Sequence, residues 1–190
     1  MTSSDDRINY LDYAATTPMR NEVLEKMLPY FTQKFGNPSS LYSLAGEARY
    51  GVDEAREQVA HVLNSRENEI VFTGSGSESN NTAIKGLASA REVGKGHIVT
   101  TSIEHHAVIQ PVEQLEKLGY EATYIGVDNT GLVDPEEFAS AVRSDTFLAS
   151  VMLVNNEIGT IQAVRRIADL TRQSAMSCGA DVLIHTDAVQ

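Results

Sequence analysis

Apolar and polar positions follow one another along this chain in a regular succession of helical and extended patterns. Apolar residues at helical spacing, or a composition typical of helices, predict helices at residues 21–35, 47–63, 77–92, 106–118, 134–142 and 164–177. Short apolar runs predict strands at residues 69–72, 97–101, 121–127, 147–154 and 182–186. From residue 69 onward the two kinds of element alternate with short connections, which is typical of an α/β domain.

The predicted strands are apolar on both faces. The runs Ile70-Val-Phe72 and Phe147–Val154 show this most clearly. A sheet whose two faces are both apolar is covered by helices on both sides and is mostly parallel. We therefore expect an α/β fold with a mostly parallel sheet. We expect the chain to divide into an irregular amino-terminal segment, residues 1–45, and a sheet domain, residues 46–190.

Composition narrows the function classes. The formal net charge of −11 argues against nucleic-acid binding, which normally needs a basic face. Cys178 is the only cysteine, so no internal disulfide is possible and nothing indicates secretion. The amino terminus lacks the apolar core of a signal peptide, and the longest apolar run is too short to span a bilayer. A cytoplasmic protein with no membrane contact is expected.

A small-residue turn, Thr73–Ser79, follows the first predicted strand and opens a helix. Small residues allow an anion to approach the backbone, the N–H groups of a helix start are donors, and Ser77 adds a hydroxyl. A phosphate monoester would fit here, although the turn lacks the spacing of a Walker A or dinucleotide motif. The alternative interpretation is an ordinary turn with Ser77 or Ser79 as the helix N-cap.

Asp187 follows the last predicted strand, and His185 lies on the same face of that strand. A buried carboxylate needs a positive partner, and a protonated pyridine nitrogen is such a partner. The alternative is an Asp that caps the next element, which is the commoner role at strand ends.

Two further polar groups follow strands at the carboxyl edge of the sheet. His105 could stack on an aromatic cofactor or move protons, or it could be a hydrogen-bonded structural residue. The amides of Asn155-Asn156 could bind a ring hydroxyl or a carboxylate, or form an Asx turn. A metal site at these histidines is disfavoured, because the spacing matches no compact zinc or iron motif. Cys178 is expected to be a small structural residue.

Each of these features is weak alone, but four of them at the carboxyl ends of successive strands converge on one site. The chain resembles the cysteine desulfurases of the nitrogen-fixation and iron–sulfur-assembly type, within the class V aminotransferase family. The motifs that carry the resemblance are Tyr10-Leu-Asp-Tyr-Ala-Ala-Thr-Thr-Pro18, Phe35-Gly-Asn-Pro-Ser-Ser40, Ile70–Asn81, Ile103-Glu-His-His-Ala-Val108, Val154-Asn-Asn-Glu-Ile-Gly159 and His185-Thr-Asp-Ala-Val-Gln190.

The resemblance implies an enzyme dependent on pyridoxal 5'-phosphate (PLP) with an aspartate-aminotransferase-like large domain. Such an enzyme takes sulfur from L-cysteine, leaves L-alanine and holds the sulfur as a persulfide for a sulfur acceptor or iron–sulfur scaffold protein. Relatives are homodimers. The resemblance also places residues 1–45 on the substrate side and residues 46–190 in the PLP-binding large domain.

The resemblance further implies a role for each residue that matches a motif. The cofactor side comprises Gly76 and Ser77 at the phosphate, His105 stacked on the ring and moving protons, Asp187 at the pyridine nitrogen, and Gln190 at the ring hydroxyl. The substrate side comprises Asn156, beside the ring and the substrate carboxylate, with Ala14 and Ala15. Two departures are Tyr42, where many relatives have His, and Ser77, where Thr is commoner.

Three functional residues of the family have no counterpart here. The lysine that forms the Schiff base, the persulfide-carrying cysteine and the substrate-binding arginine all lie beyond the position of Gln190 in the family. Neither Lys85 nor Cys178 matches them. We therefore expect an amino-terminal fragment that cannot attach the cofactor covalently and is inactive alone. The alternatives are another class V enzyme, such as a selenocysteine lyase, and a non-catalytic scaffold or split subunit.

Overall fold

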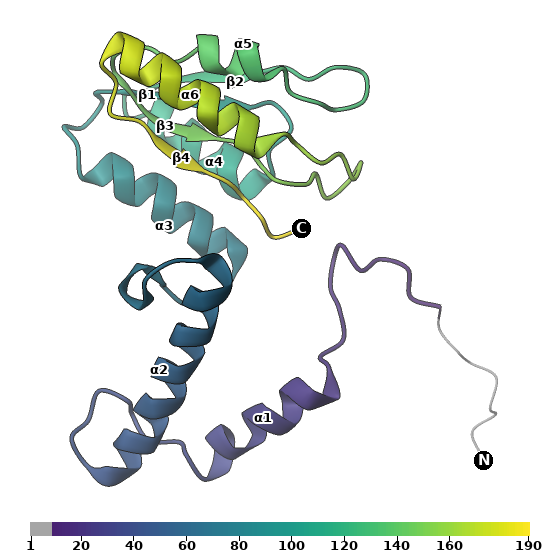
Figure 1. The fold of residues 1–190 in the computed structure, drawn as a ribbon, viewed down its shortest axis with the longest axis vertical. Coiled ribbons are helices and arrows are strands. Elements are labelled where there is room, and N and C mark those ends of the chain that lie inside the picture. The colour runs from purple at the N-terminus through teal and green to yellow at the C-terminus, as the bar shows by residue number, and fades with distance from the viewer. Residues whose placement is uncertain (1–8) are drawn as a thin grey trace. The chain divides into compact units, whose positions relative to one another are not determined.

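The computed structural model describes residues 9–190, which form two compact units (Figure 1). The first unit ends at Phe72, and the second runs from Thr73 to Gln190. The expected division between residues 45 and 46 falls inside a helix of the first unit, Ser43–Leu63. As a division of the complete protein into domains, it stays a prediction.

The first unit consists of helices. They are α1 (Asn21–Thr32), α2 (Ser43–Leu63) and the short 3-10 helix η1 (Glu67–Glu69). The long helix α2 ends at Asn64, whose left-handed backbone (φ 52°) lets its N–H donate to the carbonyl oxygens of Ala60 and His61. Arg56 of α2 donates from Nη1 to the carbonyl oxygen of Ile70 at 2.5 Å, which ties the end of this unit to α2.

The strand predicted at residues 69–72 is wrong. Glu69 instead closes η1, where its carboxylate accepts from the Arg66 backbone N–H at 2.8 Å. The residues after Glu69 are extended but pair with no other strand between residues 9 and 190, and the side chains of Val71 and Phe72 are exposed. A strand is defined by its pairing, so an apolar run without a partner does not form one.

The second unit is a parallel sheet with helices. Its strands are β1 (His97–Thr101), β2 (Glu121–Ile125), β3 (Thr146–Ser150) and β4 (Leu183–His185), in the order β2-β1-β3-β4 with every pairing parallel. Its helices are α3 (Gly76–Ser89), α4 (His106–Glu116), α5 (Pro135–Ser140) and α6 (Val164–Cys178). Each crossover between parallel strands therefore contains a helix, as such connections require.

Helices cover both faces of this sheet (Figure 1), and a hydrophobic core lies on each face. Ile98 and Leu148 point from β1 and β3 toward α3 and α4, where Val108 of α4 joins the same core. The neighbouring strand residues Val99 and Ala149 point the other way, toward α5 and α6. Side chains alternate along a strand, so one run of apolar residues supplies both cores. The predicted fold, a parallel sheet with helices on both faces, is confirmed.

The predicted strand at residues 147–154 is longer than the strand observed. β3 ends at Ser150, and Val154 instead forms an isolated antiparallel bridge with Ile161. Cys178 is also placed differently from expectation: it is the last residue of α6, and it is exposed. Helix periodicity identifies the helix but does not determine which of its terminal residues are buried.

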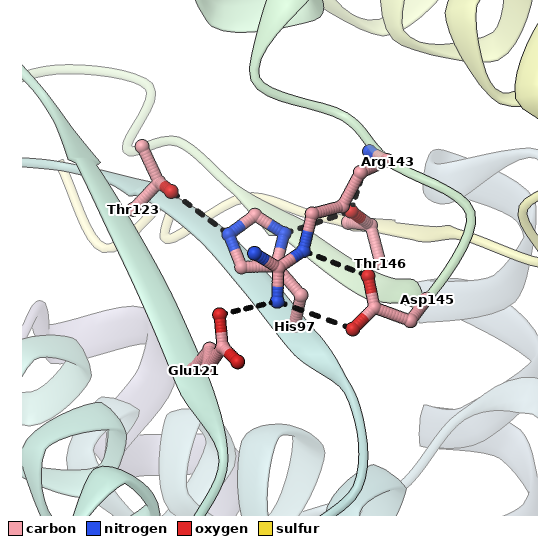
Figure 2. Close-up of polar contacts among 6 residues, drawn as sticks. All are labelled: His97, Glu121, Thr123, Arg143, Asp145 and Thr146. Carbon is pink, nitrogen blue, oxygen red and sulfur yellow. Dashed lines mark hydrogen bonds and ion pairs between the residues drawn. The ribbon is translucent and has the colours of Figure 1, made fainter.

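Polar side chains join three strands at the amino edge of the sheet (Figure 2). The ring of His97 is buried on β1, with Nδ1 2.8 Å from the Thr146 hydroxyl and Nε2 2.8 Å from the Thr123 hydroxyl. The Arg143 guanidinium lies close by and donates to the carboxylates of Glu121 (2.6 Å) and Asp145 (2.7 Å). Burial lowers the pKa of His97, so the neutral ring is favoured and each ring nitrogen pairs with one hydroxyl.

We expect His97→Ala to lower the free energy of unfolding by about 2–4 kcal/mol, because it leaves a cavity and removes the ring that pairs with both hydroxyls. The Thr146 hydroxyl still accepts from the Arg143 N–H, so the Thr123 hydroxyl loses more. Urea unfolding near pH 7.5 measures the change. His61→Ala is the matched control, since the exposed His61 side chain can be removed at a cost of about 0.5 kcal/mol or less. Equal effects of the two substitutions would show that the buried ring does not join the strands.

Candidate functional site

The groups predicted to bind a ligand follow strands at the carboxyl edge of the sheet. Because β1, β3 and β4 are parallel, the segments that leave them emerge at the same edge. These segments carry His105 after β1, Asn156 after β3 and Asp187 after β4. Backbone hydrogen bonds continue past the end of the ladder, since the Leu153 N–H donates to the Asp187 carbonyl oxygen at 2.8 Å.

The helix α3 begins in the predicted phosphate turn, but its N-cap is Ser75, not Ser77 or Ser79. The Ser75 hydroxyl oxygen accepts from the Glu78 N–H at 3.1 Å, because Gly76 is already the first helical residue. Within residues 9–190, the N–H groups of Gly76 and Ser77 and the Ser77 hydroxyl have no hydrogen-bond partner. The helix start therefore presents three free donors to an anion.

Gly76 also allows the carboxyl-terminal segment to lie against the start of α3. A Cβ atom at this position would lie 2.5 Å from Cγ2 of Val189, which is far inside van der Waals contact. Val189 is two residues beyond Asp187 in the chain. The absence of a side chain at Gly76 thus brings the segment after β4 onto the phosphate turn.

Asp187 is buried at this junction, 8% exposed, and both of its carboxylate oxygens are engaged. Oδ2 accepts from the Asn80 side-chain amide of α3 at 2.7 Å, and Oδ1 accepts from the Val189 N–H at 3.1 Å. A carboxylate has about four lone-pair sites, so two of them stay open to a further donor. These neutral donors orient Asp187 and leave its negative charge without a cationic partner among them.

Glu104 is a buried carboxyl group to which the sequence analysis assigned no role. It is 7% exposed, and its Oε1 accepts from the Thr101 hydroxyl and from the Met152 N–H, each at 2.8 Å. Burial raises the pKa of Glu104 to about 7, and the charge of Asp187 adds to the rise, while the two hydrogen bonds lower it. Its position directly before His105, after an apolar strand, was the only signal in the sequence.

His105 is the N-cap of α4. Its Nδ1 accepts from the Ala107 N–H at 3.0 Å, so a neutral ring carries its proton on Nε2. The ring is exposed, so its face is open to a stacking partner. His105 therefore also has the structural role that the sequence left open, because the hydrogen bond that caps α4 fixes the orientation of its ring.

Of the two neighbouring amides, Asn155 has the structural role. Its Oδ1 accepts from the N–H groups of Glu157 (2.9 Å) and Ile158 (3.0 Å), which is an Asx-type turn, and its Nδ2 donates to the Ile103 carbonyl oxygen. Asn156 is exposed in the same turn. The turn thus presents Asn156 and connects it to the loop before His105.

Burial also lowers the pKa of His185, against an opposing effect of Asp187, and its Nδ1 lies 2.9 Å from the Ser150 hydroxyl. Of the remaining predicted site residues, Ala14 and Ala15 belong to the first unit and Gln190 to the segment after β4. Ala14 and Ala15 are exposed in a turn of the first unit, in which the Ala15 N–H donates to the Asp12 carbonyl oxygen. Gln190 is the last residue of the segment that contacts Gly76.

These donors and acceptors fit PLP. The free N–H groups and hydroxyl at the start of α3 suit its phosphate, the oriented Asp187 carboxylate suits its ring nitrogen, and the open face of His105 suits its ring. No group of three or more His, Cys, Asp or Glu side chains among the described residues is arranged to hold a metal ion. None of the helices in the described part of the chain is long and apolar enough to cross a membrane.

The fold and this edge define an α/β domain of the kind that PLP-dependent enzymes use. Residues 9–190 match the family described as Aminotransferase class-V, and the chain belongs to that family. Among curated relatives, the cysteine desulfurase IscS of Dictyoglomus turgidum is 49% identical over 95% of this chain and 44% of its own length. The cysteine desulfurase IscS of Methanosarcina thermophila is 48% identical over 99% of this chain and 45% of its own length.

Solved structures of the family share the fold. A NifS-like protein has a TM-score of 0.89 and 40% identity over 94% of this chain and 48% of its own. SspA in complex with cysteine also has a TM-score of 0.89, with 41% identity over 95% of this chain and 50% of its own. The resemblance to cysteine desulfurases is confirmed, and it implies PLP as the cofactor. The chain spans slightly less than half the length of the curated relatives it matches.

We expect Gly76→Ala to lower the free energy of unfolding by about 1–3 kcal/mol, because the new methyl group displaces Val189. The control is Gly86→Ala in the same helix, where a Cβ atom would meet nothing within 4 Å. That substitution should stabilise the protein by about 0.5–1 kcal/mol. Urea unfolding compares the two, and stabilisation by both would contradict the close approach of Val189.

We expect Glu104 to make the stability of the apoprotein fall as the pH rises. Its pKa of about 7 in the folded state exceeds its ordinary value of 4.5, so between these values the folded chain holds a proton that the unfolded chain has lost. The contribution is complete below pH 4.5 and is lost as the pH rises through 7, about 3 kcal/mol in all.

The measurement is the difference in free energy of unfolding between the wild type and Glu104→Gln at several pH values, because His97 and His185 titrate alike in both proteins. Between pH 4.5 and 7, the free energy of unfolding of Glu104→Gln should rise relative to that of the wild type. Glu113→Gln removes an exposed carboxylate from α4 and should give a flat difference. A flat difference for Glu104→Gln as well would refute the raised pKa.

Proposed function

We propose that the complete protein that carries this chain is a PLP-dependent cysteine desulfurase. It takes sulfur from L-cysteine, releases L-alanine and passes the sulfur, held as a persulfide on a cysteine, to a sulfur acceptor or iron–sulfur scaffold protein. The curated relatives named above are cysteine desulfurases, and one similar structure contains cysteine. The substrate and the acceptor are inferred from those relatives.

The observation that carries the proposal is the junction of Asp187 with the start of α3. A buried carboxylate with open lone pairs lies beside a helix start that has three free donors, and Gly76 permits this contact. PLP carries a basic ring nitrogen and, through a methylene group on the same ring, a phosphate, so it needs an acceptor and an anion site on the same edge.

The residues of this chain hold and orient the reactants. Asp187 accepts a hydrogen bond from the ring nitrogen and keeps it protonated, which lets the bound cofactor serve as an electron sink. Gly76 and Ser77 donate to the phosphate, and His105 stacks on the ring and moves protons at Nε2. In the proposal Gln190 bonds the ring hydroxyl, Asn156 lies beside the ring and the substrate carboxylate, and Ala14 and Ala15 lie on the substrate side.

In this proposal, residues 1–190 are the amino-terminal part of a longer enzyme. The lysine that attaches the cofactor, the persulfide cysteine and the arginine that binds the substrate would come from further sequence. Cys178 would not replace the cysteine, since it ends α6 and is not at the site's edge of the sheet. The isolated 190-residue chain would then be inactive, and the complete enzyme would be a cytoplasmic homodimer.

The test is the release of alanine and sulfide by the complete protein with PLP, L-cysteine and a reducing thiol, beside the same assay on residues 1–190 alone. We expect equal amounts of both products from the complete protein and neither from the isolated chain. Alanine from selenocysteine but not from cysteine would assign a selenocysteine lyase. No turnover of either, with PLP unbound, would favour a non-catalytic scaffold.

We expect Asp187→Asn to weaken PLP binding about 10- to 100-fold, because the amide cannot keep the ring nitrogen protonated and loses a charge-assisted hydrogen bond. Equilibrium binding of PLP to the complete apoprotein measures the loss. Asp181→Asn, which alters an exposed carboxylate just before β4, should bind PLP as the wild type does. Equal affinities of the two variants would exclude Asp187 from the cofactor site.

A further inference from the structure

The Glu104 side chain accepts a backbone hydrogen bond beyond the end of β1, where a strand residue would otherwise accept it. In the sheet, β3 lies between β1 and β4. The chain continues in extended form after β3, through Met152 and Leu153, but β1 does not extend far enough to pair with this segment. On the β4 side, the Leu153 N–H donates to the Asp187 carbonyl oxygen. On the β1 side, the Met152 N–H donates to Oε1 of Glu104, a side-chain oxygen. The carboxyl group of Glu104 and the backbone of Asp187 thus lie on the two sides of one extended segment.

The two carboxyl groups differ in how their oxygens are satisfied. Asp187 receives a donor on each oxygen, from Asn80 and from Val189. Glu104 receives both of its donors on Oε1, and its Oε2 is buried without a partner among residues 9–190. An anion is best stabilised where both oxygens accept hydrogen bonds, and a bare buried oxygen is costly when charged. The negative charge therefore belongs on Asp187 and the proton on Oε2 of Glu104.

We infer that Glu104 is a proton-bearing positioning residue of this site, and that a ligand with a cationic ring nitrogen expels the Glu104 proton when it binds at Asp187. The inference rests on the proposed function, because PLP is the ligand that brings such a nitrogen. The proton passes from Oε2 to solvent, and no other bond is made or broken. Glu104 then acts through Asp187 and does not touch the ligand.

Charge balance gives the physical reason. Before binding, the pair carries one negative charge, on Asp187. After binding, two negative charges and one positive charge again sum to minus one, so the low-dielectric region keeps the same net charge. Burial is the main cause of the raised Glu104 pKa, and the charge of Asp187 adds to it. A ring cation at Asp187 cancels that added repulsion and attracts the Glu104 carboxylate, so it favours loss of the proton. The other titratable groups on the neighbouring segments are His105, next in the chain, and His185 on β4, and both are unchanged by a substitution at Glu104.

By linkage, a proton released on binding makes the affinity for PLP rise with pH. The experiment measures the dissociation constant of PLP with the complete apoprotein between pH 6 and 8.5, for the wild type, Glu104→Gln and the control Glu113→Gln. Gln keeps an oxygen for Thr101 and Met152 and has no proton to release. PLP and every other side chain of the site are the same in all three proteins, so the ratio of the wild-type to the Glu104→Gln affinity isolates Glu104.

We expect this ratio to rise about fivefold from pH 6 to 8.5, which corresponds to a fall of about one unit in the Glu104 pKa, from its value of about 7, when PLP binds. The ratio of wild type to Glu113→Gln should stay flat. A flat ratio for Glu104→Gln, with PLP bound normally, would overturn the inference and leave the proposed function standing. Failure of PLP to bind any of the three proteins at any pH would overturn both.

A second measurement needs no variant that might misfold. Difference infrared spectroscopy of the complete wild-type protein at pH 6.5 records the carbonyl stretch of protonated carboxyl groups before and after PLP is added. We expect one such band to disappear on binding, and to persist when Asp187 is replaced by Asn with PLP at saturation. A protonated-carboxyl spectrum that PLP leaves unchanged in the wild type would contradict the proton release.

Discussion

The hydrogen bond from the Met152 N–H to the Glu104 carboxyl group is the contact on which the candidate site most depends. It closes the β1 side of the segment after β3, while the Leu153 N–H is bonded to Asp187 on the β4 side. His105 follows Glu104 directly, and Asn156 follows the same segment. The relative placement of His105, Asn156 and Asp187 is thus set by this one short segment, which has a hydrogen-bond partner on each side.

The two edges of the sheet use polar groups in opposite ways. At the amino edge, His97 satisfies two hydroxyls and Arg143 bridges two carboxylates, so every polar group shown there has a partner within the protein (Figure 2). At the carboxyl edge, the donors at the start of α3 and the lone pairs of Asp187 are left open. Polar groups that pair with one another stabilise the strands, and polar groups with free donors or lone pairs are available to a ligand.

Membership of the class V aminotransferase family connects this edge with PLP chemistry, and the relatives connect it with sulfur transfer. The chain spans slightly less than half of those relatives. Our proposal assigns to it the part of the enzyme that would hold the phosphate and the ring nitrogen of the cofactor. Covalent attachment and sulfur carriage are functions that we assign to sequence beyond it. The Glu104–Asp187 pair would give the cofactor-binding part its own dependence on pH.

The sequence by itself determined the fold class, because apolar runs flanked by helical periods force a covered parallel sheet, and it placed His105, Asn156 and Asp187 after strands. It failed at residues 69–72, where local apolarity predicted a strand that had no partner, and at Ser77, where Ser75 caps the helix. Only the tertiary structure revealed Glu104 as buried and the contact of Val189 with Gly76. Local pattern encodes which face of an element is apolar, whereas burial of a charge depends on chain segments that are distant in sequence.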